Sequence, residues 1–246
     1  MSNSGGEYIT ISDENVANNL NIYATNYNGL ESQKFNIIKT RLENVVIDVS
    51  AHQGTIDWEA LKNSGEIYGV ILRISAGSYY TDAKLEENAN ALNRLGIPYG
   101  VYLYSYAEDA ITTVPDLGTY HEAQLEALRI IKAIETYNLN PVLGIYYDLE
   151  HWENGANSHW TSSDYAKIID NFHQVMVANG YGDWKIYANL YMANSSLYPW
   201  RNKITWIAQW SDKCTYTEFY NLWQYTNNGR VTGINTIVDM SIYYID

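Results

Sequence analysis

The chain has 246 residues, of which 46% are hydrophobic, and it is therefore long enough for one large domain with a substantial core. Its formal net charge of −13 argues against binding to nucleic acid or to an anionic membrane surface, because both require patches of Lys and Arg. The single cysteine, Cys214, excludes an intrachain disulfide framework, and no apolar run approaches the ~18 residues of a membrane-spanning helix.

The first 43 residues differ from the rest of the chain. They are rich in Asn and Ser, and only a weak helical periodicity runs through 16–38. We interpret 1–43 as an N-terminal extension, a linker with a helix, that joins the remaining chain to another module. The first residues contain neither the basic region nor the apolar region of a signal peptide. The predicted organisation is an extension over 1–43 and one larger domain over 44–246.

From residue 44 onward, segments typical of strands alternate with segments typical of helices. Short runs of Val, Ile and Tyr indicate buried strands, and amphipathic stretches bounded by capping residues indicate helices. Asp57 is the expected N-cap of the first helix, and Gly96 ends the second. The predicted elements in chain order are a strand at 45–49, a helix opening at 56–61, a strand at 68–74, a helix at 85–95, a strand at 99–105, a helix at 121–137, a strand ending at Asp148, a helix at 164–179 and a strand at 185–188.

The pattern changes after residue 188. Three further strands are predicted at 205–209, 222–225 and 237–240, without helices of useful length between them. Five strand–helix units followed by three strands predict an α/β fold, an irregular TIM-like barrel built on a parallel sheet. In such barrels the catalytic groups lie at the C-terminal ends of the strands. Polar side chains recur near the predicted strand ends, namely Asp48, Arg73, Tyr104, Asp148, Glu150, Gln209, Gln224 and Asp239.

The most informative segment is 144–152, an apolar run that leads into two acids. Asp148 and Glu150 are spaced i, i+2, so an extended strand points both to one face and Leu149 to the other. Two carboxyl groups at the end of a buried strand cost free energy unless they are paired or used. General acid–base chemistry on a glycosidic bond is the commonest use of such a pair. The alternative is a pair of surface acids.

Several stretches of the chain resemble the lysozymes of glycoside hydrolase family 25, which are N-acetylmuramidases that cut bacterial peptidoglycan. The resemblance covers the chain from Asn44 onward and leaves 1–43 unexplained. It implies a (β/α)5(β)3 barrel, in agreement with the strand count, and glycan strands of peptidoglycan as the partner. The matching stretches, in the family's order, are 46–54 with 56–58, 146–150, 206–210, 223–226 and 238–239.

Four carboxyl groups are the catalytic candidates: Glu150, Asp148, Asp48 and Asp239. Glu150 is the candidate general acid, because the leaving oxygen must be protonated and a neighbouring Asp148 anion raises the pKa of Glu150. By resemblance, Asp48 and Asp239 line the site, and the alternative for each is a cap on a neighbouring turn. Because four carboxylates in one cleft repel one another, the site must be wet or partly protonated.

The role of Asp148 stays open at this point. Cα atoms two residues apart on a strand are separated by ~6.6 Å, and side-chain direction can shift the carboxyl separation either way. That separation therefore does not distinguish a retaining from an inverting enzyme. The family is similar to retaining enzymes, which leaves two routes. In the route we prefer, Asp148 orients and stabilises the attacking 2-acetamido group of the substrate; in the other it is a covalent nucleophile.

The aromatic composition suits carbohydrate binding, because 24 Tyr and 8 Trp stand against 3 Phe, and polar-tipped rings fit the faces of sugars. Gln209 and Gln224 are candidates for binding hydroxyl or acetamido groups. Arg73, at the same end of the barrel, is a further candidate for substrate binding, and its alternative is an ion pair with one of the acids. The alternatives are core positions for the aromatic rings and backbone hydrogen bonds for the glutamines. The candidate sugar platforms are Tyr104, Tyr106, Tyr147, Trp210 and Trp223.

Other classes of protein fit the sequence less well. A chitinase-like hydrolase usually carries a further acid two residues before the pair, where this chain has Tyr146. A non-catalytic carbohydrate-binding module on a decayed barrel would have lost its acids first. A metal site is disfavoured because His52, His151 and His159 lack metal-ligand spacing, and we expect no cofactor.

The expected location is extracellular or at the cell wall, for a protein that is secreted or released as a phage lysin. Its net charge gives no attraction to an anionic wall. Targeting is therefore expected from 1–43, from a wall-binding or N-terminal module absent from this chain, or from the aromatic cleft.

Overall fold

A computed structural model describes residues 21–25, 31–36, 44–108, 110–114, 118–150 and 156–244, and the chain divides into two compact units, Met1–Arg41 and Leu42–Asp246. In the first unit, β1 (Asn21–Thr25) pairs antiparallel with β2 (Glu31–Asn36). The helix predicted within 16–38 is therefore wrong for these two segments. Such short strands show too few repeats for their period to be read, and Asn-rich sequence is a poor helix former. The rest of that prediction lies outside the described residues.

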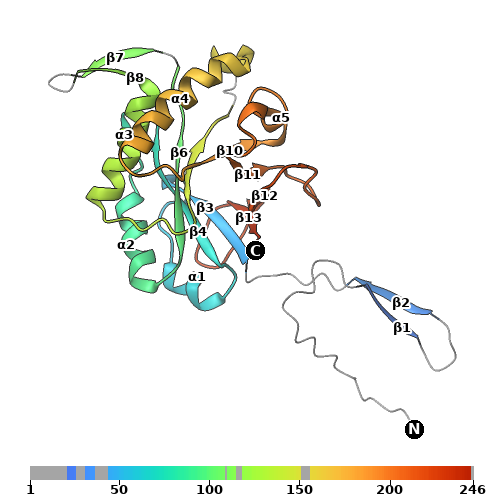
Figure 1. Cartoon of the computed structure of the whole chain (residues 1–246). Coiled ribbons are helices and arrows are strands. Elements are labelled where there is room, and N and C mark those ends of the chain that lie inside the picture. Colours follow the sequence, from blue (N-terminus) through green and yellow to red (C-terminus); the bar gives the residue numbers. More distant parts are fainter. Residues whose placement is uncertain are drawn as a thin grey trace, which may run out of the picture. The chain divides into compact units, whose positions relative to one another are not determined.

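The second unit is built around a closed β-barrel (Figure 1). Each parallel strand pairs with the next along the chain, and β13 runs antiparallel to both β12 and β3, which closes the barrel. The predicted irregular TIM-like (β/α)5(β)3 barrel is thus confirmed. The barrel strands are β3 (Val45–Val49), β4 (Gly69–Ala76), β6 (Tyr99–Tyr104), β9 (Ile145–Asp148), β10 (Lys185–Asn189), β11 (Ile204–Ala208), β12 (Leu222–Gly229) and β13 (Val238–Tyr243).

Helices follow the first five barrel strands, as predicted. Asp57 caps the first of them by accepting a hydrogen bond from the Ala60 N–H at 2.9 Å, and Gly96 ends the second with a left-handed φ of 65°. The fifth helix is only one turn long. No helix among the described residues is both long and apolar enough to cross a membrane. The helices are α1 (Trp58–Ser64), α2 (Leu85–Leu95), α3 (Glu122–Thr136), α4 (Ser162–Ala178) and α5 (Leu190–Ala193).

A few short elements lie between the barrel strands and the helices, and they were not predicted. The short β5 (Tyr80–Thr81) pairs with the end of β4, and a hairpin of β7 (Ile111–Val114) and β8 (Gly118–His121) precedes α3. The 3₁₀ turns are η2 (Ala51–Gln53), η3 (Ala156–His159) and η4 (Tyr198–Trp200). Most of these elements lie in connections where no apolar period is long enough to read from sequence.

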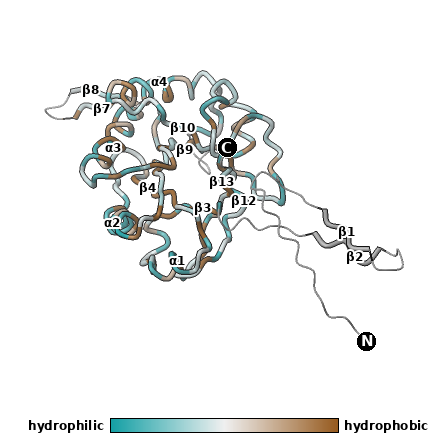
Figure 2. The backbone as a smooth tube through the Cα atoms, turned by 60° about the horizontal axis from the view of Figure 1, so that its bottom comes forward, coloured by the Kyte–Doolittle hydropathy of each residue, from teal (hydrophilic) through white to brown (hydrophobic). Residues whose placement is uncertain are grey.

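Side chains on the barrel strands alternate between two cores. One set packs outward beneath the helices, as Ile47, Leu72 and Tyr147 do. The other set fills the barrel interior around Trp206, whose ring contacts Tyr187 edge-on at 4.6 Å between centroids. Figure 2 shows the result, with β3 and β4 strongly apolar and much of α2 hydrophilic. Because the interior is plugged by these rings, polar groups pointing inward can reach solvent only at a rim.

Candidate active site

The four predicted acids gather at one rim of the barrel. Asp148 is the last residue of β9, and Asp48 lies one residue before the end of β3. Asp239 lies near the start of β13 rather than at a C-terminal strand end, which corrects the prediction. Since β13 is antiparallel, its start lies at the rim where the parallel strands end, and Asp239 pairs in register with Asp48.

Alternation along β9 places Asp148 and Glu150 together. Tyr147 and Leu149 are buried in the outer core, so the residues between and after them point inward. Asp148 is only 5% exposed, and the negative charge of Glu150 is the strongest of the neighbouring charges that act on its carboxyl group. The shared face predicted for the two acids is therefore what the fold provides.

Asp48 and Asp239 form a carboxyl pair. Burial, and then the charge of Asp239, raise the pKa of Asp48 well above its ordinary value. Burial raises the pKa of Asp239 as well, and a hydrogen bond between two carboxyl groups requires a proton on one of them, so the pair retains a proton toward neutral pH. Asp48 Oδ2 accepts from the Gln224 amide, with Nε2 to Oδ2 at 3.0 Å.

Asp148 and Glu150 form the second pair of acids. Burial raises the pKa of both, and for Asp148 the charges of Glu150 and then Asp48 add to the effect, while Arg73 opposes it. Groups this strongly coupled titrate as a unit, and a pair with raised pKa values retains a proton toward neutral pH. Oδ1 of Asp148 is buried without a hydrogen-bond partner among the described residues.

A hydrogen-bond network fixes where the proton of that pair sits. The Gln224 Oε1 accepts from the Trp210 indole N–H at 3.1 Å, and since indole only donates, this sets the orientation of the amide. The same Oε1 accepts from the Tyr187 hydroxyl at 3.0 Å. Tyr187 is also hydrogen-bonded to Glu150. Its single proton is already directed at Gln224, so its oxygen is left to accept from a protonated Glu150.

The direction of the hydrogen bond between Tyr187 and Glu150 affects the pKa of Glu150. A hydrogen bond donated by Tyr187 to the carboxylate would lower that pKa, partly offsetting burial. A hydrogen bond accepted by Tyr187 from the acid raises it further. The donation from Tyr187 to Gln224 favours the second direction, and burial and the Asp239 charge raise the pKa of Glu150 in either case.

The other predicted residues that reach the rim have varied surroundings. Tyr104 and Tyr106 meet edge-on at 5.1 Å between centroids, and Tyr106 and Trp210 are 53% and 59% exposed, as platforms for sugars require. Arg73 does not pair with one of the four acids. Its Nε lies 2.8 Å from the Asp82 carboxylate, from where its charge still favours the ionised form of Asp148.

Three predicted substrate contacts are corrected by the structure. Tyr147 is fully buried in the outer core, stacked on Phe172 at 3.8 Å, because it is one residue out of phase with Asp148. Trp223 is out of phase with Gln224 in the same way and packs in the outer core. The Gln209 side chain is engaged in its own loop, where Oε1 accepts from the Thr215 N–H at 2.8 Å.

The surroundings of Gln224 also differ from those predicted for a residue that binds substrate. It is 2% exposed, and its amide is hydrogen-bonded to Asp48, Tyr187 and Trp210. It therefore holds Asp48 and Tyr187 in position from the buried side of the site and does not offer a free amide to a sugar.

The correction at Tyr147 can be tested by replacing it with Phe. Its hydroxyl donates to the buried Glu126 carboxylate at 2.6 Å, so we expect a loss of about 1–3 kcal/mol in the free energy of unfolding. The ring stays stacked on Phe172, and kcat/KM should stay within about twofold of wild type. Urea unfolding and wall-lysis kinetics measure the two quantities. A large fall in kcat/KM at unchanged stability would show that Tyr147 contributes to substrate binding after all.

Two residues of the rim were missed by the sequence analysis. Tyr187 bridges Glu150 and Gln224, and Tyr102 lies inside the barrel against Trp206 at 6.1 Å between centroids. Tyr102 was detectable, because it is in phase with the predicted Tyr104 on β6. Asp82, the partner of Arg73, follows the unpredicted β5 and left no signal. Among the described residues, no group of three or more His, Cys, Asp or Glu is arranged to hold a metal ion.

A closed barrel with paired carboxyl groups at its catalytic rim defines a glycoside hydrolase domain. Residues 47–234 match the model of glycosyl hydrolases family 25, and the chain belongs to that family. It is 26% identical to lysozyme M1 of Streptomyces globisporus over 202 residues, which cover 78% of this chain and 65% of the relative.

Solved structures show the same fold. The modular autolysin LytC of Streptococcus pneumoniae, in complex with a synthetic peptidoglycan ligand, is 30% identical, with a TM-score of 0.72 over 90% of this chain and 50% of LytC. A family 25 glycosyl hydrolase from Bacillus anthracis is 21% identical, with a TM-score of 0.65 over 84% of this chain and 91% of that one, a likeness of fold alone. This chain therefore spans half of LytC and about two thirds of lysozyme M1.

Proposed function

We propose that this domain hydrolyses the β-1,4 bond between N-acetylmuramic acid and N-acetylglucosamine in peptidoglycan. Membership of family 25, the relative named as a lysozyme and the peptidoglycan ligand of LytC support this substrate class. The catalytic domain would begin near residue 44, with 1–43 as a linker. The enzyme would act at the cell wall, outside the cell that makes it or after release.

The observation that carries the proposal is the polarity of the hydrogen bonds around Glu150. Cleavage of a glycosidic bond needs a carboxylic acid that is still protonated when substrate arrives. Because Tyr187 donates to Gln224, its oxygen can accept from a protonated Glu150, whose pKa is already raised by burial and by the Asp239 charge. Glu150 is therefore the general acid that gives its proton to the leaving oxygen.

Asp148 supplies the negative charge on the other side of the reaction. Its unpartnered Oδ1 suits a group that only the substrate supplies, either the N–H of a 2-acetamido group or the anomeric carbon itself. Arg73 favours the ionised form of Asp148. When Glu150 holds the proton of the pair, Asp148 is ionised and can orient the acetamido group as it attacks the anomeric carbon. We prefer this substrate-assisted route to a covalent bond with Asp148.

The bond cleaved is tested by product analysis. Purified peptidoglycan is digested, and the sugar at each new reducing end is identified after borohydride reduction. N-acetylmuramitol is the expected reduced product. In a separate unreduced digest, the new N-acetylmuramic acid end should be the β-anomer before mutarotation, because both proposed routes retain configuration. New reducing ends on N-acetylglucosamine would show that the other glycosidic bond is cut. Wall binding without new reducing ends would show a binding module instead of an enzyme.

Replacing Tyr187 with Phe tests the direction of its hydrogen bond to Glu150. If Tyr187 accepts from the protonated acid, its loss lowers the pKa of Glu150, and the alkaline limb of kcat/KM moves to lower pH. If Tyr187 donates to the carboxylate, the limb moves to higher pH, and the proton placement fails. The buried ring stays in place in this variant, so a change in the melting temperature of a few degrees would not obscure the pH profile.

A further inference from the structure

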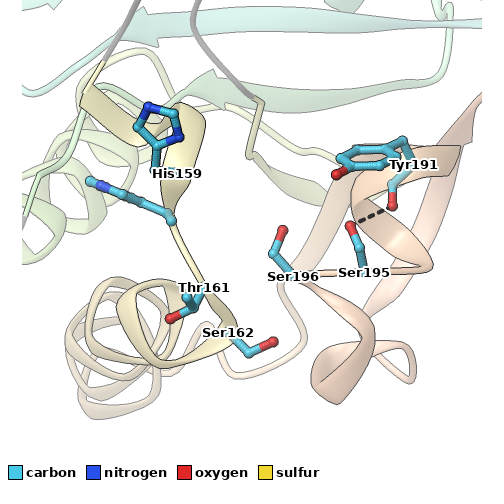
Figure 3. Close-up of a pocket in the computed structure, with 7 residues that line it drawn as sticks. His159, Thr161, Ser162, Tyr191, Ser195 and Ser196 are labelled. Atoms are coloured by element: carbon cyan, nitrogen blue, oxygen red, sulfur yellow. Dashed lines mark hydrogen bonds between the residues drawn. The ribbon is translucent and has the colours of Figure 1, made fainter.

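One hollow in the described part of the chain does not contain the acids. It encloses about 410 Å³, within the range of about 300–1,000 Å³ that is typical of small-molecule sites. Figure 3 shows its two walls, with His159, Thr161 and Ser162 on one side and Tyr191, Ser195 and Ser196 on the other. Trp160 also lines it.

Each wall is attached to a barrel strand that ends at the rim of the acids. One wall includes the end of η3, a turn in which the Asn157 amide donates to the main-chain carbonyl of Glu150 at 2.7 Å. The other begins at α5, whose N-cap is Asn189, the last residue of β10. Because β9 and β10 are neighbouring parallel strands, the hollow lies at the same rim as Asp148 and Glu150.

The chemistry of the hollow favours a neutral polar ligand. Apart from the His159 imidazole, its lining consists of aromatic rings and hydroxyl groups, with no Asp, Glu, Lys or Arg. The start of α4 is not an anion site, because the Asp164 carboxylate already accepts from the Thr161 N–H at 2.9 Å and from its hydroxyl at 2.8 Å. A stem peptide, with its carboxylates and amines, would find no charged partner here.

The aromatic residues are presented as carbohydrate sites require. Tyr191 is 70% exposed, and its carbonyl is held by the Ser195 hydroxyl at 2.7 Å. Trp160 is supported edge-on by Tyr165 at 5.3 Å between centroids. Ser196 also lines the hollow, and its buried Oγ has no hydrogen-bond partner among the described residues.

We propose that the hollow between Trp160 and Tyr191 is a distal subsite for an uncharged N-acetylhexosamine ring of the glycan strand. The inference rests on the proposed function and extends it. Glycans long enough to fill the subsite gain binding energy remote from the scissile bond, which raises kcat/KM for long strands over short ones.

The test compares Tyr191→Ala with wild type on two glycans without stem peptides, a tetrasaccharide and an octasaccharide of alternating N-acetylglucosamine and N-acetylmuramic acid. We expect kcat/KM to fall about tenfold on the octasaccharide, the loss of roughly one good ring contact, and to stay unchanged on the tetrasaccharide. Trp160→Phe should give a smaller fall of the same kind. Phe219→Ala is the matched control, since Phe219 is 62% exposed and lies outside the lining.

Each other outcome overturns the subsite. Equal falls on both glycans would mean damage to the catalytic centre, and no fall on either would mean that sugar does not occupy the hollow. A fall seen only on peptide-bearing glycans would assign the hollow to the stem peptide. If wild type cleaves neither glycan, the proposed function fails by itself. Calorimetry of octasaccharide binding to wild type and Tyr191→Ala then decides the subsite, with equal affinities counting against it.

Discussion

Replacing Glu150 with Gln is expected to lower kcat for peptidoglycan cleavage by about 10²–10⁴-fold, the contribution usual for a general acid. The amide has nearly the shape of the acid and can still donate to Tyr187, so the network to Gln224 stays intact. KM and the melting temperature should therefore change little. Release of reducing ends from purified walls measures the rate, and calorimetry measures the melting temperature.

A matched control separates this effect from the loss of a negative charge. Glu135→Gln makes the same change on the exposed side of α3, away from the rim, and should leave kcat unchanged. If Glu150→Gln kept more than about a tenth of wild-type kcat, the proton would have to come from another group. Asp48 would then be the next residue to replace, because burial and the Asp239 charge raise its pKa well above the ordinary value.

Burial also shapes the pH dependence of wild type. Since burial raises the pKa of Glu150, the acid stays active at a higher pH than an ordinary glutamate would. kcat/KM should fall on the alkaline side as the Asp148 and Glu150 pair gives up its proton. The limb belongs to the coupled pair rather than to one residue, and in Glu150→Gln it should disappear from the residual activity.

The sequence predicted the barrel because its strands and helices differ strongly in apolar period. The run into Asp148 is short and fully apolar, whereas 121–137 repeats at helical spacing, and these two patterns specify different elements. The N-terminal strands and the β7–β8 hairpin were missed for the opposite reason. They are short, and 111–114 alternates between exposed and half-buried positions at the edge of the fold.

The predictions for the site were right where the alternation of side chains along a strand was taken into account. They were wrong where that alternation was ignored. Asp148 and Glu150 are in phase, and both point inward. The same rule, applied one residue earlier, would have removed Tyr147 and, on β12, Trp223. The Tyr187 bridge needed more than phase, because it depends on how β10 and β12 face each other across the barrel. Contacts across the barrel interior have no signature in sequence order.

Replacing Asp148 with Asn is expected to make the protein more stable at neutral pH while lowering kcat by about 10²-fold or more, as loss of a preorganised electrostatic group does. The pKa of Asp148 is raised well above its unfolded value by burial and by the charges of Glu150 and Asp48. In the folded state this group therefore binds its proton more tightly than in the unfolded state. Its contribution to stability is present at low pH and is lost as pH rises through the folded pKa.

The direction of this pH dependence can be measured directly. Urea unfolding of wild type between pH 4 and pH 8 should show a free energy of unfolding that falls as pH rises, and Asp148→Asn should flatten the slope. The gain at the upper end is about 1.4 kcal/mol for each unit by which the fold has raised the pKa. The Asn amide can donate to the neighbouring carboxyl groups, so the variant leaves no donor stranded. A variant less stable than wild type at pH 7 would instead make Asp148 a structural residue.

The same residue decides between the two retaining routes. If the substrate's acetamido group attacks the anomeric carbon, Asp148 never forms a bond to sugar, and mass spectrometry of wild type quenched during turnover finds no glycosyl ester there. If Asp148 is the nucleophile, the ester appears on the peptide that contains 148, and the unpartnered Oδ1 is the oxygen that reacts. Asp148→Asn distinguishes the routes again, because an amide can still align an acetamido group by hydrogen bonding. Residual activity well above that of Glu150→Gln would favour the substrate-assisted route, whereas activity as low as that variant's would favour the covalent one.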